Sequence, residues 1–485
     1  MNTLQRRTPF NLPIRVLQFG QGNFLRGFFD WQIDLLNERC GLNAGVVIVR
    51  PTSRSKAPLL DSQDGLYTTV VRGLDEQGQV AQSHRVISCV QRELDLSHHM
   101  AEFLLLAQNP DIQFVVSNTT EAGIATNTED QYHDAPPSAF PAKLTRWLHA
   151  RFEHFDGSAE SGVVVLPMEL IDHNGEALKD AVLFFAKRWN LGSDFEAWLQ
   201  TACSFCSTLV DRIVPGYPSD EMPKLQAELG YRDPFLVTAE YYHLLLIQGP
   251  AKVAEMLKLP GSGLNIQLVD DIAPYKLRKV GILNGGHTAM VPVALLAGLN
   301  TVGQAMQDEQ VSAFLKHVLF DEIIPALPLP ADELTVFAEE VLRRFGNPFI
   351  QHRLASIALN SWSKFAVRVM PQMRNYHRER GHWPPHLVFA LAATMRLYRG
   401  DVVALSDEAS YLEWWRSAWE RLDSGSLTVR DLISIWLAKK NLWGDDLSQQ
   451  APLVEALTVH FSTLRNGDAR ELINPIPANA LKERI

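Results

Sequence analysis

Short runs of apolar residues recur along the first half of the chain, with helical spacing between them. The runs lie at residues 14–19, 46–49, 114–116, 163–166 and 207–213. Runs of this length, rich in Val, Ile and Leu, are typical of strands buried on both faces of a sheet. Because strands alternate here with helices, the pattern predicts a parallel, doubly wound sheet covered by helices.

A glycine-rich turn joins the first predicted strand to the first predicted helix. Glycines at such a turn let backbone N–H groups approach a pyrophosphate. Leu25 occupies the place of the third glycine in GxGxxG, so the motif itself is incomplete. What favours a dinucleotide site is the position of the turn, between a strand and a helix. The expected cofactor-binding residues here are Val16, Leu17, Gln18, Phe19, Gly20, Gln21, Gly22, Asn23, Phe24, Leu25, Arg26 and Gly27.

The ends of the next two strands bear on the choice of cofactor. An acidic residue after the second strand would hold the adenosine ribose, but Arg50 stands there and could favour the 2′-phosphate of NADP. From the residues alone, NAD and NADP both remain open. The strand at 114–116 runs into small polar residues, of which Thr119 and Glu121 would face the cofactor. The alternative for that segment is a capped loop.

After about residue 270 the pattern changes to helices. Apolar residues recur at helical spacing from Leu334 to Phe345, between a proline-rich segment and Gly346. Two more helices are expected at about 385–400 and after Thr428. We therefore expect an α/β protein with a Rossmann-like domain at residues 1–270 and a mostly α-helical substrate and catalytic domain at 271–485.

Composition and charge narrow the range of functions. The chain of 485 residues is 46% hydrophobic and 21% charged, which is typical of a globular protein. Its net charge of −10, with no basic stripe, argues against a nucleic-acid partner. No apolar run approaches the length of a membrane span, and residues 1–13 lack the apolar core of a signal peptide. We expect a cytoplasmic protein without a membrane partner; its oligomeric state is left open.

Cysteine and histidine offer little support for a metal. Four cysteines are too few for a disulfide framework and suit a reducing compartment. The pair Cys203 and Cys206 has no second pair or flanking histidine, and the pair His98-His99 lacks partners at ligand spacing. Buried thiols are the expected role of the cysteines, and no metal site is expected.

The segment at 270–287 carries the best candidate for proton-transfer chemistry. Lys279, Asn284 and His287 follow a predicted helix start at Pro274. At about 100° per residue they fall within an arc of roughly 140°, so one helix face can present all three to a cleft. A desolvated lysine, an amide donor and an imidazole can move a proton and polarise a carbonyl. The alternative is a solvated lysine, a capping asparagine and a structural histidine.

In order and spacing, these motifs resemble those of the mannitol dehydrogenase family of polyol-specific long-chain dehydrogenases. The resemblance covers nearly the whole chain. It rests on Gly20-x-Gly22-x-Phe24-x-Arg26, Ser117-Asn118-Thr119-Thr120-Glu121, Asn174-Gly175, Val210-Asp211-Arg212-Ile213, the block from Asp271 to His287, and Ser363-x-Phe365 with Arg368. One position departs from the family, because Lys276 stands where mannitol dehydrogenases have a glutamate. A carboxylate proton route at that position is therefore not expected.

The resemblance implies hydride transfer between NAD and a substrate carbon, with no metal. Lys279 would be the acid and base, with its pKa lowered from about 10.4 towards roughly 7–8 by burial and nearby cations. Asn174 and Asn284 would donate hydrogen bonds to the carbonyl oxygen as it becomes an oxyanion, and His287 would orient the substrate. Arg50-Pro51 is shared with the members that this chain resembles, which implies NAD despite the missing acid.

Four segments resemble the family members that act on keto-uronates, which implies a small sugar-acid substrate in hexuronate catabolism. They lie at 31–36, 45–51, 63–69 and 205–212. Lys364 and Arg368, four residues apart on a predicted helix, are the candidates for holding the carboxylate, and Asp211 is a further substrate-binding candidate. The alternatives are a sister keto-uronate or mannitol dehydrogenase and, from another class, a non-catalytic nucleotide-binding regulator.

Overall fold

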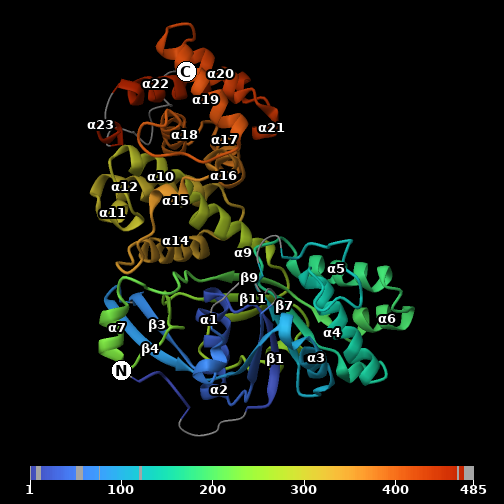
Figure 1. Ribbon diagram of the computed structural model, residues 1–485. Helices are drawn as coiled ribbons and strands as arrows, with labels where there is room; N and C mark the ends of the chain where they lie inside the picture. The colour runs from blue at the N-terminus through green and yellow to red at the C-terminus, as the bar shows by residue number, and fades with distance from the viewer. Residues whose placement is uncertain are drawn as a thin grey trace. The chain divides into compact units, whose positions relative to one another are not determined.

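The computed structural model describes residues 2–6, 12–50, 58–75, 77–119, 123–466 and 469–473. Two compact units make up the chain, one of Met1–Asp75 and Val80–Ile272 and the other of Ala273–Ile485 with Glu76–Gln79. The first, coloured blue to green in Figure 1, is an α/β unit, and the second, yellow to red, is helical. The predicted fold class, a Rossmann-like domain followed by a mostly helical one, is confirmed.

A parallel sheet forms the centre of the first unit. In the part of the chain that the structure describes, its six strands have the order β5-β2-β1-β6-β7-β8. They are β1 (Ile14–Phe19), β2 (Gly45–Arg50), β5 (Val90–Asp95), β6 (Phe114–Ser117), β7 (Val164–Pro167) and β8 (Ser204–Phe205). All neighbours pair in parallel, and the order reverses between β1 and β6. Doubly wound sheets bind ligands at the carboxyl ends of their strands at such a reversal.

Two smaller sheets complete the first unit. One contains β3 (Tyr67–Leu74), β4 (Val80–Ile87) and β10 (Val237–Ala239), and the other contains β9 (Ser207–Asp211), β11 (Leu244–Gln248) and β12 (Ile266–Val269). The predicted strand at 207–213 therefore exists, but it ends at Asp211 and pairs antiparallel with β11 rather than joining the central sheet.

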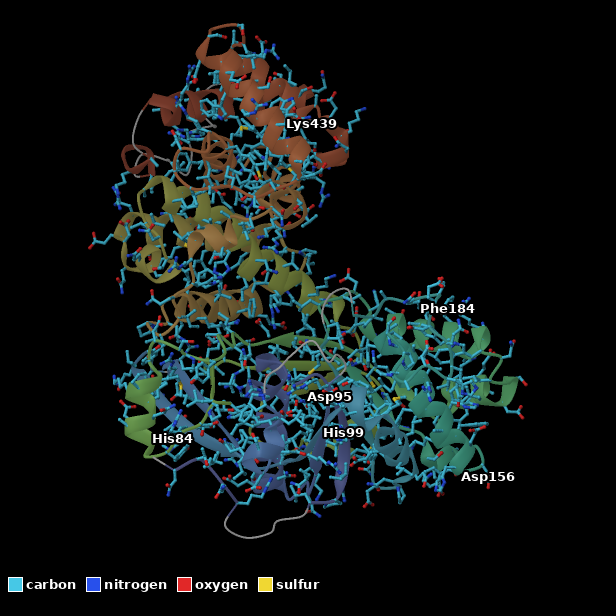
Figure 2. The ribbon with its side chains drawn as sticks, viewed as in Figure 1. His84, Asp95, His99, Asp156, Phe184 and Lys439 are labelled. Carbon is cyan, nitrogen blue, oxygen red and sulfur yellow. The ribbon has the colours of Figure 1, made fainter. Side chains whose placement is uncertain are left out.

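Eight α-helices lie in the described part of the first unit. They are α1 (Asn23–Gly27), α2 (Phe29–Cys40), α3 (Leu96–Leu105), α4 (Phe140–His154), α5 (Asn174–Arg188), α6 (Ser193–Thr201), α7 (Met222–Leu229) and α8 (Lys252–Met256). One of them, α3, begins with a side-chain cap. Asp95, labelled in Figure 2, caps α3 by accepting a hydrogen bond from the backbone N–H of Ser97, and its carbonyl contacts the ring of His99.

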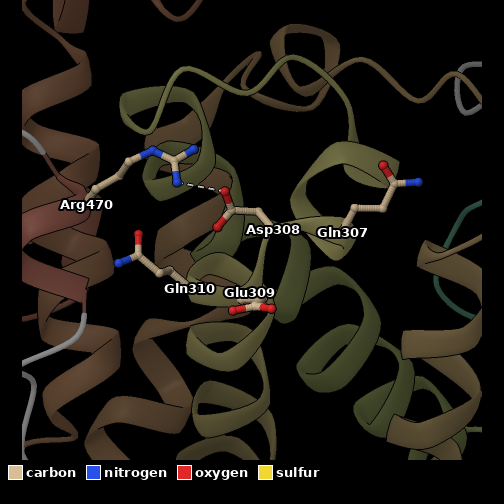
Figure 3. A pocket seen from close by; sticks show the side chains of 5 residues that line it. All are labelled: Gln307, Asp308, Glu309, Gln310 and Arg470. Carbon is tan, nitrogen blue, oxygen red and sulfur yellow. Dashed lines mark hydrogen bonds and ion pairs between the residues drawn. The ribbon is translucent and has the colours of Figure 1, made fainter.

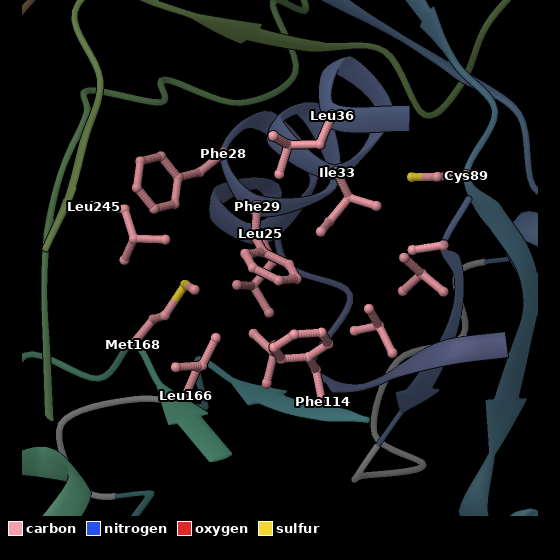
Figure 4. Close-up of a cluster of buried hydrophobic side chains, with 14 of the residues drawn as sticks. Leu25, Phe28, Phe29, Ile33, Leu36, Cys89, Phe114, Leu166, Met168 and Leu245 are labelled. Carbon is pink, nitrogen blue, oxygen red and sulfur yellow. The ribbon is translucent and has the colours of Figure 1, made fainter. Parts of the chain in front are cut away.

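The core of the first unit lies on both faces of the central sheet. Along β1, Val16 belongs to the cluster on one face, whereas Leu17 and Phe19 belong to the cluster on the other. This alternation follows from the two-residue period of a strand. Figure 4 shows part of the first cluster, in which side chains of residues 25–36 lie over those of the central sheet and beside Leu245 of β11: Leu25, Phe28, Phe29, Ile33, Leu36, Phe114, Leu166 and Met168.

The second unit is built from helices. Their bounds are α9 (Ala273–Arg278), the π-helix η4 (Lys279–Asn284), α10 (Gly285–Leu296), α11 (Val302–Gln307), α12 (Glu309–Lys316), the π-helix η5 (His317–Ile323), α13 (Ile324–Ala326), α14 (Ala331–Phe345), α15 (Leu354–Ile357), α16 (Ser361–Arg368), α17 (Met370–Arg380), α18 (Pro385–Leu397), α19 (Ala409–Asp423), α20 (Val429–Leu437), α21 (Lys440–Trp443), α22 (Ala451–Asn466) and α23 (Arg470–Ile473). The helices predicted at 334–345, 385–400 and after Thr428 correspond to α14, α18 and α20.

A tryptophan cluster anchors α16 within this unit. The ring of Trp362 stacks on Trp415, with centroids 5.4 Å apart, and also packs against Trp436 at 4.6 Å. Lys439, labelled in Figure 2, lies over the rings of Trp414 and Trp436. No helix among the described residues has the length and apolarity that crossing a membrane would require.

Candidate functional site

The predicted dinucleotide turn leaves β1 through a glycine that the backbone requires. Gly20 has a φ of +112°, which residues with a side chain rarely adopt, and a Cβ atom there would lie 3.3 Å from the carbonyl oxygen of Asn118. At Gly22 no atom lies within 4 Å of the place of a Cβ atom. The turn therefore passes close to the end of β6 and then opens to free space, which suits the approach of a phosphate group.

Arg26 braces this turn from inside the protein. Its Nε donates to the carbonyl oxygen of Gln21 at 3.1 Å, and Nη2 donates to Oδ1 of Asn23 at 2.7 Å. Nη1 donates to the carbonyl oxygen of Phe235, and the side chain is buried. These bonds fix the turn before any ligand arrives.

The other predicted cofactor residues divide by where their side chains lie. Val16, Leu17, Phe19 and Leu25 are buried in the two core clusters, so only their backbone could meet a ligand. A Cβ atom on Gly27 would lie 2.9 Å from Val214, so this glycine permits close packing. Phe24 stacks on the core residue Phe28, and Gln18 is fully buried and donates to the carbonyl oxygen of Gly20 at 3.2 Å.

Arg50 is engaged inside the protein. It ends β2 and forms an ion pair with Glu93 on β5, with N and O atoms 2.9 Å apart and side chains only 4% and 0% exposed. Nη2 of Arg50 also donates to Oε1 of Gln21 in the turn at 2.8 Å. Burial raises the pKa of Glu93. These groups engage the guanidinium inside the protein. The charge of Arg50 is therefore balanced by Glu93 and does not require a 2′-phosphate.

A glutamate that the sequence pattern did not identify ties together the ends of β6 and β7. Oε1 of Glu169 accepts hydrogen bonds from the backbone N–H and the hydroxyl of Thr119, both at 2.9 Å, and Oε2 accepts one from the hydroxyl of Ser117 at 3.0 Å. Burial raises the pKa of Glu169, against the effect of these bonds. The feature of the sequence that could have pointed to Glu169 is its position just after a buried strand. Glu121 lies outside the described residues.

Asn174 has a different environment from the one that an oxyanion donor needs. Its Nδ2 donates to the carbonyl oxygens of Pro167 and Glu169, at 2.9 and 3.0 Å, and its Oδ1 accepts from the backbone N–H of Thr208 at 2.8 Å. The residue is 1% exposed. Both amide hydrogens are thus used within the first unit, where Asn174 joins β7 to β9. This geometry does not match the expected donation to a substrate carbonyl and gives the side chain a positioning role.

Asp211 is the last residue of β9 and is buried. The next residue, Arg212, donates from Nη1 to the carbonyl oxygen of Gly27 at 2.8 Å and lies 4.1 Å from the ring centroid of Trp31. Burial lowers the pKa of Arg212 to about 9. The end of β9 is therefore linked to α1 and α2, the helices that follow the glycine turn.

In the second unit, Lys279 and Asn284 are the first and last residues of the π-helix η4. The hydrogen bonds of a π-helix join residues five positions apart, so the chain returns over Lys279 at Asn284. The expectation of a regular α-helix, which separates the two by 140°, was wrong at this point. Both side chains are half-buried. The π-turn therefore brings the two positions at which these side chains leave the backbone closer together around the helix axis than a regular α-helix would.

His287 lies on α10, just beyond this turn. Its ring stacks on Phe345, with centroids 3.9 Å apart, and the ring of His352 meets it edge-on at 5.3 Å. Its Nε2 is buried and makes no hydrogen bond to any residue that the structure describes. Burial holds the pKa of His287 well below its usual range, and nearby basic groups lower it further: His352, Arg344, Arg368 and Lys364. His287 is therefore neutral at physiological pH.

Two of those basic groups come from α16, whose buried Trp362 and Phe365 fix the helix in place. Nζ of Lys364 donates to the carbonyl oxygen of Ile357 at 2.9 Å. The guanidinium of Arg368 makes no hydrogen bond or ion pair within the described ranges of the chain. Burial lowers the pKa of both side chains. The structure thus brings the two predicted carboxylate-binding residues into the surroundings of His287.

None of the predicted site residues lines the cavity drawn in Figure 3. It has a volume of about 580 Å³ and is lined by Gln307, Asp308, Glu309, Gln310 and Arg470. Asp308 pairs with Arg470 at 2.7 Å and also caps α12. Asp308 and Arg470 are therefore used in holding α23 beside the start of α12.

The described residues give little support to a metal site or a redox-active pair of cysteines. Within the described ranges, no group of three or more His, Cys, Asp or Glu side chains is arranged to hold a metal ion. Cys203 and Cys206 are free thiols, and burial raises their pKa values to about 12 and about 11. Thiols with pKa values this high are poor nucleophiles.

Comparison with known proteins gives the family. The model of the mannitol dehydrogenase Rossmann domain matches residues 14–261, and the model of the mannitol dehydrogenase C-terminal domain matches residues 271–465. The chain belongs to the mannitol dehydrogenase family. The resemblance drawn from the motifs is thereby confirmed.

Individual relatives match over nearly the full length. The chain is 51% identical over 479 residues to a protein named altronate oxidoreductase from Yersinia enterocolitica, covering 98% of this chain and 99% of the relative. It is 50% identical over 482 residues to a protein of the same name from Cronobacter sakazakii, covering 98% and 100%.

Two solved structures share the fold. D-sorbitol dehydrogenase in substrate-free form matches with a TM-score of 0.80 at 22% identity, covering 98% of this chain and 100% of that one. A ternary complex of Pseudomonas fluorescens mannitol 2-dehydrogenase with NAD and D-mannitol matches with a TM-score of 0.69 at 21% identity, covering 97% and 96%.

Proposed function

We propose that this protein is an altronate oxidoreductase, which interconverts D-tagaturonate and D-altronate with NAD as the hydride carrier. The observation that carries this proposal is the 51% identity to a relative of that name, over 98% of the chain. The matched region spans both units. The protein is accordingly an enzyme that acts on a CH–OH group.

The first unit fits the cofactor. The turn at Gly20 and Gly22 lies where the strand order reverses and leaves room for a pyrophosphate. Arg50 is neutralised by Glu93, which supports NAD over NADP. When bound, the nicotinamide supplies or accepts the hydride. The residues of the turn bind and orient the cofactor, with Thr119 as a further contact at the end of β6.

The second unit supplies the proton chemistry. In reduction, Nζ of Lys279 gives its proton to the developing alkoxide oxygen, and in oxidation the neutral amine takes the proton from the hydroxyl. Asn284, at the other end of the π-turn, donates a hydrogen bond to the same oxygen, where negative charge develops. The neutral His287 orients the substrate.

Recognition of a sugar acid requires cations that a polyol dehydrogenase does not need. Arg368 has a guanidinium that no described residue engages, and a carboxylate can accept two parallel hydrogen bonds from it. Lys364 adds a second positive charge from the same helix. Asp211 is proposed to accept a hydrogen bond from a substrate hydroxyl.

Oxidation of NADH by the purified protein tests this proposal, with D-tagaturonate, D-fructuronate and D-fructose compared side by side. Fast turnover of tagaturonate, with little of the other two and loss of activity in Lys279→Ala, is the expected result. Preferential turnover of fructuronate or fructose would assign the enzyme to a sister activity. NADH binding without turnover of any of them would instead indicate a regulatory protein.

A further inference from the structure

Four basic side chains of the second unit act on one buried imidazole, that of His287. We call these side chains and His287 together the basic cluster: His287 on α10, Arg344 on α14, His352 on the following loop, and Lys364 and Arg368 on α16. Arg344 and His352 are the members that no sequence motif indicated. The ring of His352 lies 5.3 Å from that of His287 and meets it edge-on, whereas Phe345 stacks on His287.

The backbone holds His352 firmly in this place. Its carbonyl oxygen accepts a hydrogen bond from Val302 at 3.0 Å, and the next residue, Arg353, forms an isolated bridge with Thr301. The imidazole is half-buried, yet its ring nitrogens have no hydrogen-bond partner among the described residues. A half-buried ring that is fixed in position but unpaired is available to a ligand.

Three polar groups of the basic cluster share this condition. Nε2 of His287, the ring nitrogens of His352 and the guanidinium of Arg368 all lack partners in the part of the chain that the structure describes. Unsatisfied polar groups and like charges gathered in one place cost free energy, and proteins keep such arrangements mainly at functional sites. The ligand that satisfies donors and positive charge together is an anion.

We propose that His352 is a specificity-determining residue of the enzyme, which binds the substrate carboxylate together with Arg368 and takes up a proton as the carboxylate arrives. The inference rests on the proposed function, because it assigns the basic cluster to the acid group that distinguishes a uronate from a neutral ketose. A carboxylate accepts the fork of Arg368 on one side and an imidazole N–H on the other.

The proton uptake follows from the charges around His352. The ring of His287 from α10 lies against His352, and Arg344 from α14 and Lys364 and Arg368 from α16 act on that His287 ring, with Asp407 acting on Lys364. Burial lowers the pKa of His352 in the free protein. A bound carboxylate reverses this effect because an adjacent opposite charge favours the protonated ring. Affinity for the acid therefore falls as pH rises, whereas affinity for a neutral sugar does not change through this group.

Titration calorimetry of the NADH complex tests the proposal. D-altronate and its neutral counterpart D-altritol would be titrated in two buffers of different ionisation enthalpy, which reveals the protons taken up. In the wild type we expect uptake with altronate and none with altritol. In His352→Gln we expect altronate to bind about tenfold more weakly, as for a lost hydrogen bond to a charged group, and without proton uptake.

Matched variants separate a specific role from a structural one. His317→Gln removes another imidazole of the same unit, one that bonds to Asp321, and should leave both titrations unchanged. His352→Asn repeats the test with a shorter amide. Equal weakening of altronate and altritol, or uptake that persists without His352, would overturn the proposal.

The proposed function fails in a different way. If the wild type neither binds nor oxidises altronate, that function and this inference fall together. If the wild type oxidises altronate and the His352 variants retain its KM and pH dependence, only the inference falls.

Discussion

Arg50 and Glu93 form a buried ion pair between the ends of the neighbouring parallel strands β2 and β5. The pair lies beside the glycine turn, since Arg50 also bonds to Gln21. In sequence the two residues are 43 positions apart, and the strand end where an acid would hold the ribose carries a base instead. The ion pair balances the charge of Arg50 inside the protein, at the strand end where the base stands.

Replacing Glu93 by glutamine should shift the enzyme toward NADP. With its partner neutral, the charge of Arg50 is no longer balanced by Glu93, so kcat/KM for NADP should rise about tenfold relative to NAD. Breaking a buried pair typically costs about 3–5 kcal/mol, so the melting temperature should fall as well. Initial rates with both cofactors measure the ratio.

Glu221→Gln is the matched control for this change. It removes the partner of Arg72 in the same unit, at a half-exposed site. Its cofactor ratio should equal that of the wild type. An unchanged ratio in Glu93→Gln would mean that Arg50 does not face the ribose.

Asn174 and Asn284 should respond differently to alanine. Asn174→Ala loses several internal hydrogen bonds worth about 1 kcal/mol each, so the free energy of unfolding should fall by about 2–4 kcal/mol. Asn284→Ala should keep its stability but lose about 10²–10³ in kcat, as for removal of an oxyanion donor. Denaturant unfolding and steady-state kinetics on both variants measure these effects. A stable Asn174→Ala protein with a hundredfold loss in kcat would restore Asn174 as a carbonyl donor.

Arg368→Gln should raise KM for tagaturonate by roughly tenfold or more while sparing neutral ketoses. The reason is loss of a charge-assisted hydrogen bond that only the carboxylate makes. Arg380→Gln, at an exposed position of α17, serves as control for a lost charge. Steady-state kinetics with tagaturonate and a neutral ketose measure this difference. Equal losses of kcat/KM on both substrates would show that Arg368 supports the fold of the site rather than its selectivity.

Much of the first unit could be predicted from the sequence. The strands β1, β2, β6 and β7 are continuous apolar runs, because both faces of the central sheet are buried, and the helix after the glycine turn has a clear period. The strands β3 and β4 escaped notice. β4 is largely exposed and carries mixed polar residues, so its sequence lacks the apolar alternation of a half-buried strand.

The candidate site was predictable only where neighbours in sequence are also neighbours in space. Lys279 and Asn284 could be paired by spacing, although the π-helix that joins them has no sequence signature. Glu169 and His352 could not be assigned to a site from the sequence, since the residues that they contact come from distant segments. The internal bonds of Asn174 could not be predicted for a related reason: its hydrogen bond with Thr208 depends on a contact between distant segments that the local sequence does not encode.

Stability should depend on the titration of Asp30, which lies beneath the glycine turn. The carboxylate is fully buried and accepts a hydrogen bond from the hydroxyl of Tyr67 at 3.0 Å, and burial raises its pKa to about 7. In the unfolded chain an aspartate has a pKa of about 3.9. Between these values the folded state holds a proton that the unfolded state has lost, so the free energy of unfolding falls as pH rises from about 4 to about 7.

Asp30→Asn should remove this contribution. Measured by denaturant unfolding from pH 5 to pH 8, the stability of the variant relative to the wild type should improve with rising pH, by at most about 1.4 kcal/mol per pH unit. The gain should level off above about pH 7. Parallel curves for the two proteins would contradict an uncharged Asp30 in the folded state.

Transfer of deuterium from labelled NADH tests the central claim most directly. With both hydrogens at nicotinamide C4 replaced by deuterium, reduction of D-tagaturonate should give D-altronate one mass unit heavier, with the label on the new carbinol carbon. The same reaction with Lys279→Ala should be slower by orders of magnitude. Unlabelled altronate, or no altronate from an active wild-type preparation, would contradict direct hydride transfer to this substrate and with it the proposed function.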